Sequence, residues 1–250
     1  MPAYDFKAPR LFVEADLAQG TVLPLERAQA NYLINVLRKG EEDPVLVFNG
    51  RDGEWHGQLV ARGRKDGELR LVARTRPQTA PVDLHYLFAP LKSARLDYLA
   101  QKAVEMGAGL IRPVITRYTQ GDRVNLDRLR ANAIEAAEQC GILAIPALAP
   151  PARLPEAMAS LEPSRLLVFC DEDAPIADPV RALGAAADPA NPPPLAVLVG
   201  PEGGFSEEER AAIRDRPNTV ALSLGPRILR ADTAAVAVLA LVQAVLGDAR

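Results

Sequence analysis

The stretches LAVLVGPEGGFSEEER (residues 195–210) and TVALSLGPRILRADTAA (residues 219–235) decide the fold of this chain. Each begins with a short apolar run rich in Val and Leu, residues 195–199 in the first and 219–224 in the second, and each run ends in a Gly-Pro turn. Such runs are typical of strands buried on both faces of a parallel sheet. Ligands of open α/β sheets bind at the carboxyl ends of the strands. We therefore expect the two strands to be neighbours and their loops to form one wall of a pocket.

A helix is predicted after each of these loops. Ser206 and Glu209 have the spacing of a capping box, which predicts a helix start at that point. Asp232 or Thr233 is expected to cap a second helix, residues 233–246. That helix is nearly all Ala, Val and Leu, so we expect most of its surface to be buried. Its apolar surface also favours a homodimer, in which a second copy covers it.

The composition limits the class of protein. The 250 residues suit one large or two small domains. No apolar run is long enough to span a membrane, and the first ten residues predict no signal peptide. Cys140 and Cys170 are far apart, which favours reduced thiols and a cytoplasmic location. With only His56 and His85 in the sequence, we expect neither a histidine metal site nor a histidine-dependent triad.

Charge is distributed unevenly along the chain, although the net charge is only −3. Residues 92–130 contain eight basic and four acidic residues, whereas residues 131–250 contain nine basic and sixteen acidic ones. A polyanion would be bound by such a local basic face and not by the whole surface. Ordinary variation in surface charge is the alternative explanation.

The first part of the chain, residues 1–76, is predicted to be a small β-rich domain. Expected strands are residues 10–13, 21–23, 44–48, 54–61 and 69–74, with a hairpin turn at residues 49–53. A helix is expected over residues 25–38, ended by Gly40, with Tyr32, Leu33, Val36 and Leu37 on its inner face. The Pro-containing residues 76–81 are predicted to be a linker.

From residue 82 onward, expected strands and helices alternate, which predicts a parallel α/β sheet. Further strands are expected at residues 83–89, 110–115 and 165–170. Pro113 lies inside the second of these and predicts an edge or an irregularity there. Ser93 and Asp127 are the expected caps of two helices, the first with Leu96, Leu99, Ala103 and Met106 on its inner face. Residues 149–163 and 171–194 are expected to be surface loops with short helical turns.

The loop GPEGG does not have the pattern of a phosphate site. It lacks the Lys-Ser/Thr pair of a P-loop, and Glu202 within it would repel phosphate. A neutral or cationic ligand suits the loop better. A tight turn with no ligand is the structural alternative.

Several motifs of this chain are similar to those of one known family. They are GPEGGFSEEE and LGPRILRADTAA, then KSARLDYLAQKAVEMGAGLIRPVITRYTQ and RANAIEAAEQCG, and more weakly RLFV and NYLINVLRKGEEDPVLVFNG. The chain thereby resembles the RsmE family of S-adenosylmethionine-dependent ribosomal RNA (uracil-N3) methyltransferases, which belong to the SPOUT class. Asp232 stands where a glutamate is more usual in the family, and Ala231 where a threonine is.

The resemblance implies an α/β fold with a C-terminal SPOUT α/β trefoil-knot domain, residues 82–250, and a small N-terminal PUA-like β-barrel domain, residues 1–76. The N-terminal domain would bind RNA, and the C-terminal domain would bind S-adenosylmethionine in its knot. The implied reaction is methylation of N3 of a uridine in 16S ribosomal RNA of the small ribosomal subunit, by a homodimer. We expect neither a membrane nor a metal to take part.

The same reasoning predicts a set of site residues. Arg230 is the candidate cation for charge that develops on the uracil, and Glu202 or Asp232 is the candidate acceptor of the N3 proton. The residues expected to hold the cofactor are Leu198, Gly200, Pro201, Glu202, Gly203, Gly204, Leu224, Gly225, Ile228, Leu229, Thr233 and Ala234. Those expected to contact RNA are Arg10, Arg38, Lys39 and Arg117 at phosphates and, from the resemblance, Gln139.

Two other functions remain open from the sequence. One is a non-catalytic RNA-binding protein that keeps the knot as a dimerisation module. The other is a methyltransferase that acts on transfer RNA, which fold-level likeness does not separate from a ribosomal one.

Overall fold

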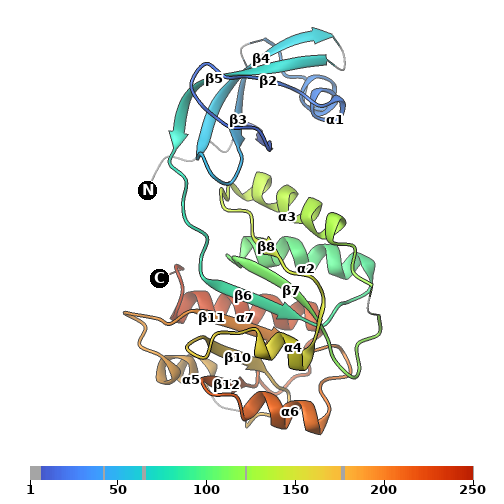
Figure 1. Ribbon diagram of the computed structural model, residues 1–250, viewed down its shortest axis with the longest axis vertical. Coiled ribbons are helices and arrows are strands. Elements are labelled where there is room, and N and C mark those ends of the chain that lie inside the picture. The colour runs from blue at the N-terminus through green and yellow to red at the C-terminus, as the bar shows by residue number, and fades with distance from the viewer. Residues whose placement is uncertain (1–6, 42, 64–65, 122, 176–177, 250) are drawn as a thin grey trace. The chain divides into compact units, whose positions relative to one another are not determined.

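The computed structural model describes residues 7–41, 43–63, 66–121, 123–175 and 178–249 (Figure 1). The chain divides into two compact units. The first comprises Met1–Ala80 with Ala137–Ile145, and the second comprises Pro81–Ala136 with Pro146–Arg250. The described part of the chain contains no helix long and apolar enough to cross a membrane.

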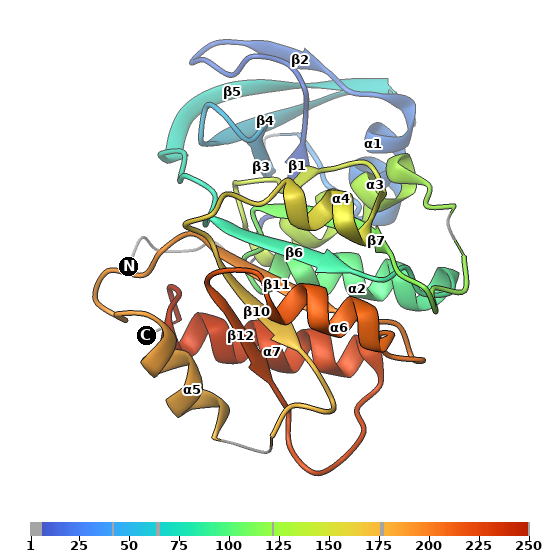
Figure 2. The same cartoon turned by 60° about the horizontal axis from the view of Figure 1, so that its bottom comes forward.

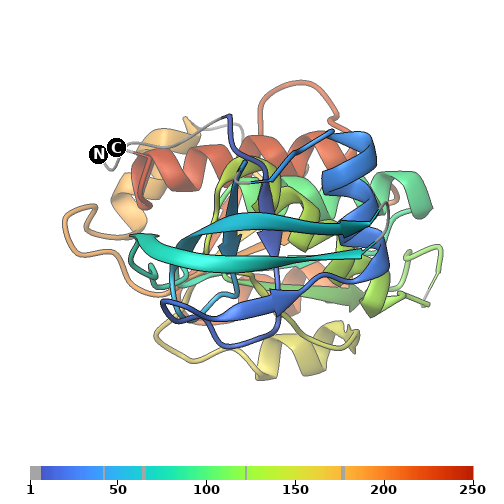
Figure 3. The same cartoon turned by 90° about the horizontal axis from the view of Figure 1, so that it is seen from above.

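A five-stranded sheet forms the first unit, in the order β1-β3-β4-β5-β2 (Figure 3). Its strands are β1 (Arg10–Phe12), β2 (Val22–Pro24), β3 (Pro44–Phe48), β4 (Glu54–Gly63) and β5 (Asp66–Arg76). β1 is parallel to β3, and the other pairs are antiparallel. Alternate side chains such as Val45, Val47, Leu69 and Leu71 point into one apolar core. All five predicted strands are present.

The predicted helix of this unit is shorter and less regular than expected. It consists of α1 (Arg27–Asn31) followed by the π-helical turn η1 (Tyr32–Val36). Leu33 is fully buried, as predicted, but Tyr32, Val36 and Leu37 are exposed, so their assignment to the inner face was wrong. The π-helical turn changes the 3.6-residue period on which that assignment depended. Arg38, and not Gly40, takes the left-handed backbone conformation after the turn, with φ of 55°.

An ionic cluster lies inside the first unit around the buried Glu54. Arg10 Nε donates to Glu54 Oε2 at 3.1 Å, and Arg76 Nε donates to Glu54 Oε1 at 3.0 Å. Burial opposes ionisation of Glu54, but the hydrogen bonds from Arg76 and Thr75 outweigh it and hold its pKa below the usual value. Because Arg10 is only 8% exposed and is engaged by Glu54, it is not placed to contact an RNA backbone.

A parallel sheet forms the second unit, in the order β12-β10-β11-β6-β7-β8, with β9 also pairing with β7 (Figure 2). Its strands are β6 (Leu84–Phe88), β7 (Leu110–Ile115), β8 (Ala147–Leu148), β9 (Ala152–Arg153), β10 (Leu166–Cys170), β11 (Leu195–Val199) and β12 (Thr219–Leu222). The helices are α2 (Ser93–Glu105), α3 (Leu126–Cys140), α4 (Leu154–Ala159), α5 (Pro179–Ala186), α6 (Glu207–Arg214) and α7 (Ala231–Val245).

The order of these strands corrects one prediction. β11 and β12, which carry the two glycine loops, are not neighbours, because β10 pairs with both of them. Val168 of β10 lies opposite Val197 on one side and Val220 on the other. The loop that follows β10 therefore lies between the two glycine loops.

Pro113 lies at an irregularity, as predicted. β8 pairs with Leu110 and Ile111, and β9 pairs with Val114 and Ile115, so neither strand pairs at the proline. Proline has no N–H to donate to a neighbouring strand. None is needed at this position, because the partner of β7 changes here from β8 to β9. The segments predicted as loops on either side of β10 contain β9, α4 and α5.

The predicted capping box of α6 is confirmed: Glu209 N donates to Ser206 Oγ at 3.3 Å, and Ser206 N donates to Glu209 Oε2 at 3.0 Å. Three other predicted caps were wrong by one to three residues. Lys92 precedes α2 and Arg230 precedes α7 at the cap position, neither with a side-chain cap hydrogen bond. Asn125, and not Asp127, caps α3 by accepting from Arg128 N at 3.0 Å. Helix ends depend on single backbone angles, which residue type alone does not determine.

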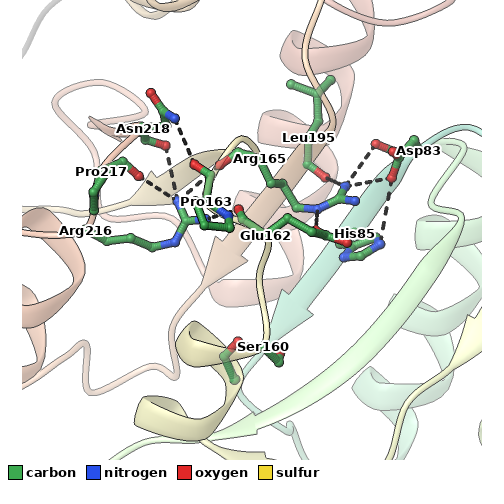
Figure 4. Close-up of polar contacts among 11 residues, drawn as sticks. Asp83, His85, Ser160, Glu162, Pro163, Arg165, Leu195, Arg216, Pro217 and Asn218 are labelled. Carbon is green, nitrogen blue, oxygen red and sulfur yellow. Dashed lines mark hydrogen bonds and ion pairs between the residues drawn. The ribbon is translucent and has the colours of Figure 1, made fainter.

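A polar cluster closes the amino ends of β6, β10 and β11 (Figure 4). The buried Arg165 donates from Nη1 to Asp83 Oδ1 at 2.7 Å and to the Leu195 carbonyl at 2.9 Å. Its Nε donates to Glu162 Oε2 at 2.7 Å, which helps to lower the pKa of Glu162 to about 2. His85 lies beside Asp83, with 3.8 Å between Nε2 and Oδ1. The cluster ties the strands together at the end opposite the glycine loops.

Candidate functional site

A cavity of about 360 Å³ lies at the carboxyl ends of β10, β11 and β12. Three loops line it, one after each strand, together with the first turn of α7. Its lining residues are Cys170, Asp171, Glu172, Val199, Gly200, Pro201, Glu202, Gly203, Gly204, Leu222, Ser223, Leu224, Gly225, Pro226, Arg227, Ile228, Leu229, Ala231 and Ala234. This position is the one at which open α/β sheets bind ligands, and the volume falls within the range of small-molecule sites.

The loop after β11 takes its shape from close contacts at its glycines. A Cβ on Gly200 would lie 2.5 Å from the Phe205 ring, which itself packs edge-on against Phe169. Gly204 has φ of 68°, and its N–H donates to the Pro201 carbonyl at 2.9 Å. Gly200 and Gly204 are therefore required by the protein's own packing and backbone conformation.

The loop after β10 forms the middle of the cavity and was missed in the sequence analysis. Asp171 is fully buried and accepts from Arg210 Nη1 at 2.9 Å and also from Arg214. Glu172 lines the cavity, is half exposed, and accepts from Arg210 Nη2 at 2.6 Å. The acidic run Asp171–Asp173 directly after a predicted strand was the available signal. This run could be assigned to the cavity only when the order of the strands was known.

Cys170 closes the cavity at the end of β10. Burial, and next the negative charge of Asp171, raises the pKa of this thiol to about 12. A thiol of that kind stays protonated near neutral pH and is a poor nucleophile. The side chain therefore serves as an apolar wall of the cavity.

Arg95 of α2 links two of the predicted catalytic carboxylates. Its Nη1 donates to Glu202 Oε1 at 2.9 Å, and its Nε lies 3.9 Å from Asp232 Oδ2. Asp232 lies in the first turn of α7 and does not line the cavity, and its Oδ1 accepts from Thr233 N at 2.9 Å. Arg95 therefore joins the loop after β11 to the amino end of α7.

The loop after β12 is the most exposed wall. Gly225 has φ of 103°, which an L-residue adopts only with strain. Arg227 lines the cavity and is exposed, and the Ile228 side chain is 94% exposed.

The cavity brings together most of the residues predicted to hold the cofactor. Those that line it are Gly200, Pro201, Glu202, Gly203, Gly204, Leu224, Gly225, Ile228, Leu229 and Ala234. Leu198 does not line it, because it is fully buried in the apolar core. Thr233 is exposed and also lies outside the lining. Of the candidate catalytic residues, Glu202 lines the cavity, and Arg230 lies exposed at the cap position of α7.

The remaining residues predicted to contact RNA fall in both units. Arg38 and Gln139 are exposed and Lys39 is partly exposed, all in the first unit. Arg117 is exposed in the second unit, where its backbone N–H donates to Glu209 Oε1 at 2.8 Å. Among the residues that the structure describes, no group of three His, Cys, Asp or Glu side chains is arranged to hold a metal ion.

Two family models match the chain. The RNA methyltransferase domain matches residues 78–243, and the RNA methyltransferase PUA domain matches residues 25–72. The model of the RNA methyltransferase domain contains all three loops that line the cavity.

Curated relatives match nearly the whole of this chain. The ribosomal RNA small subunit methyltransferase E of Rickettsia conorii is 28% identical over 238 residues, which is 95% of this chain and 96% of the relative. The protein of the same name from Synechocystis is 30% identical over 245 residues, 96% of this chain and 78% of the relative.

Solved structures share the fold. The ribosomal RNA small subunit methyltransferase E of Neisseria gonorrhoeae, bound to S-adenosyl methionine, is 25% identical and superposes with a TM-score of 0.83 over 97% of this chain and all of its own. A Legionella pneumophila methyltransferase in complex with the same cofactor is 27% identical, with a TM-score of 0.81 over 95% of this chain and 98% of its own. The predicted combination of a PUA-like domain and a parallel-sheet SPOUT domain is thereby confirmed. The chain belongs to the ribosomal RNA small subunit methyltransferase E family of RNA methyltransferases.

Proposed function

We propose that this protein transfers a methyl group from S-adenosylmethionine to N3 of a uridine in 16S ribosomal RNA. The observation that carries the proposal is the cavity formed by three strand-end loops in the domain that matches the RNA methyltransferase model. Relatives over the whole chain are named for methylation of small-subunit ribosomal RNA, and two solved relatives hold S-adenosylmethionine.

The residues of the cavity suit that cofactor. Val199, Leu222 and Ala234 supply apolar surface for an adenine ring, and the many backbone groups of the glycine loops supply donors and acceptors. Glu172 and Glu202 are acidic residues of the wall that pair with Arg210 and Arg95, and their carboxylate oxygens favour a sulfonium and an ammonium group over a phosphate. When bound, S-adenosylmethionine supplies the electrophilic methyl group.

The protein then has to position the base and manage one proton. Uracil N3 becomes a good nucleophile only when it loses its proton, and the base carries the resulting negative charge on its oxygens. Arg230 is the proposed cation for that charge, and Glu202 is favoured over Asp232 as the proton acceptor because only Glu202 lines the cavity. Holding the two reactants in line is worth about 7–11 kcal/mol of the barrier.

We assign RNA affinity outside the cavity to residues 1–76, with Arg38 and Lys39 as phosphate contacts. Residues 82–250 are the proposed catalytic domain, in which the C-terminal segment would form the knot that SPOUT proteins share. Arg117 and Gln139 complete the proposed RNA contacts. The cytoplasm is the proposed location, since the ribosomal subunits are assembled there.

The test is mass spectrometry of nucleosides from ribosomal RNA of a deletion strain. We expect 3-methyluridine to disappear from 16S RNA and to return when the wild-type gene is restored. If the methylated nucleoside is lost instead from transfer RNA, the substrate assignment is wrong. If neither RNA changes and the purified protein fails to bind S-adenosylmethionine, the protein is a non-catalytic RNA binder.

A further inference from the structure

Tyr118 is an exposed aromatic residue that lies against the loop after β11. We call this loop the donor loop, because it is proposed to bind the methyl donor. Tyr118 is 47% exposed, belongs to the same unit as the cavity, and follows β7 by three residues. A Cβ on Gly203 would lie 3.2 Å from Tyr118 Cβ and 3.7 Å from its Cγ. Gly203 itself lines the cavity and is exposed. The tyrosine therefore lies one residue away from the lining, on the outer side of Gly203.

The turn that carries Tyr118 is held in place on both sides. Thr116 N donates to Thr119 Oγ1 at 2.9 Å, and Thr119 N donates to the Thr116 carbonyl at 3.2 Å. Arg117 N donates to Glu209 Oε1 at 2.8 Å, and Glu209 is part of the capping box that starts α6. A side chain presented from so restrained a turn loses little further freedom when it binds a ligand.

The proposed reaction requires a group that can receive a base. N3 lies on the pairing edge of uracil, so the target nucleotide has to be unpaired or turned out of its helix before the methyl group can reach it. Proteins hold such bases by stacking them on exposed aromatic rings, which is the general mode of recognition for unpaired RNA. The exposed Arg117 beside Tyr118 adds positive charge for the adjoining phosphate.

We infer that Tyr118 is the platform on which the target uracil stacks as it enters the cavity past Gly203. This inference rests on the proposed function and assigns it a base-positioning residue. The interaction uses the face of the ring, so the hydroxyl group contributes little. It is made to the RNA and not to S-adenosylmethionine.

The experiment compares Tyr118→Phe, Tyr118→Leu and Tyr118→Ala in the full-length protein. The substrate is small ribosomal subunits purified from the deletion strain, and donor binding is measured separately by calorimetry. Stacking of one base is worth roughly 10-fold or more in binding. We therefore expect kcat/KM to fall roughly 10-fold or more for the Leu and Ala variants, to stay within about two-fold for Phe, and donor affinity to be unchanged in all three.

Tyr98 provides the matched control. It is 44% exposed in the same unit, and it lies on α2 with Lys102 Nζ 5.4 Å from its ring centre. Tyr98→Ala should leave kcat/KM within about two-fold of wild type.

Each other outcome has a defined meaning. Full activity of Tyr118→Leu would show that a ring is not needed and would overturn the inference. A parallel loss of donor affinity in Tyr118→Ala would also overturn it, because the tyrosine would then act by supporting the loop at Gly203. If wild-type protein methylates no uridine in the subunits, the proposed function is wrong and the inference, which rests on it, is overturned as well.

Discussion

Arg95 Nη1 donates to Glu202 Oε1 at 2.9 Å, although the two residues are 107 positions apart in the chain. The same guanidinium lies 3.9 Å from Asp232. One cation from α2 therefore holds a carboxylate of the donor loop and a carboxylate of the last helix. Both carboxylates are candidates for accepting the N3 proton, and Arg95 lies within ion-pair distance of each.

Replacement of Arg95 should affect activity more than stability. Arg95 and Glu202 are both more than one-third exposed, and exposed pairs stabilise proteins by about 0.2–1 kcal/mol. We expect Arg95→Ala to lower the free energy of unfolding by no more than about 1 kcal/mol. Turnover should fall roughly 10-fold or more, because Glu202 loses the partner that positions it.

The control for Arg95 is Arg128→Ala. Arg128 of α3 pairs with Asp97, which lies on α2 as Arg95 does, with 2.8 Å between Arg128 Nε and Asp97 Oδ1. Neither Arg128 nor Asp97 lines the cavity. Urea unfolding and single-turnover methylation of both variants are the measurements. If the two variants keep equal activity, Arg95 is only a surface ion pair.

Gly200→Ala should distort the loop after β11. The new Cβ would lie 2.5 Å from the ring of Phe205, which is buried against Phe169 in the apolar core. Overpacking of this kind costs about 1–3 kcal/mol. We expect calorimetry to show a large loss of donor affinity. Gly203→Val should likewise weaken donor binding, since its Cβ would already touch Tyr118.

Gly184→Ala is the matched control for these variants. Gly184 lies within α5, and a Cβ there would meet nothing within 4 Å. Alanine is favoured over glycine inside a helix by about 0.5–1 kcal/mol, so this variant should be slightly more stable and bind the donor normally. Normal donor binding by Gly200→Ala would contradict the assignment of this loop.

Arg230→Ala should lower turnover without weakening donor binding. Arg230 is exposed at the start of α7 and is not part of the cavity lining. Loss of a single group that stabilises developing negative charge costs roughly 100-fold or more in turnover. Donor affinity should stay within a few-fold, the sign of an interaction formed only on the way to reaction.

Arg227→Ala is the comparison for Arg230, because Arg227 does line the cavity. Calorimetric donor binding and single-turnover methylation distinguish the two arginines. If Arg230→Ala loses donor binding and methylates normally at saturating donor, the catalytic cation has to be reassigned to Arg227 or to a basic residue of a second subunit.

His85 should make the protein less stable as the pH falls below 6.5. Burial and the charge of Arg165 lower the pKa of His85 from its ordinary 6.5, although Asp83 and Glu162 act in the opposite direction. The unfolded chain then binds the proton first, so the free energy of unfolding decreases as the pH drops below 6.5. Glu162, with its pKa lowered from 4.5 to about 2, contributes its own loss only below pH 4.5.

The measurement is the urea midpoint of wild type and of His85→Asn between about pH 5 and pH 8. The variant should lack part of the decrease between about pH 6.5 and pH 5 that wild type shows. Titration of the His85 ring by NMR should give a pKa below 6.5. An unshifted or raised value would contradict the role of burial.

The protein should be a homodimer in solution. Thr233, Ala240 and Ala244 are exposed on α7, and Ala237 and Leu241 between them are only partly buried, which leaves an apolar stripe uncovered along an otherwise buried helix. Light scattering at micromolar concentration should give twice the mass of the 26.9 kDa chain. A stable and active monomer would show that the stripe is not an interface. Leu241→Glu should dissociate the dimer, while Val180→Glu, at an exposed site on α5, should not.

Local patterns in the sequence determined much of this protein. The bounds of β11 were predicted without error, because a run of five apolar residues between a proline and a Gly-Pro turn has few other structures open to it. The capping box of α6 was equally local, since both of its hydrogen bonds join residues three positions apart. Nine of the residues predicted to hold the cofactor line the cavity for the same reason: they occupy the two stretches that directly follow β11 and β12, and Ala234 joins them from the first turn of α7.

Only the tertiary structure decided which of these loops meet and which charges are paired. β10 inserts between β11 and β12, and this places Glu172 in the cavity, yet no local pattern encodes the order of parallel strands. Arg10 resembled a surface cation in the sequence but is buried against Glu54, 44 positions away. Arg95 and Glu202 are likewise far apart in the sequence and form an ion pair only in the folded chain. Ion pairs between distant residues depend on where the chain folds back, and that is determined by the packing of the whole sheet and its helices.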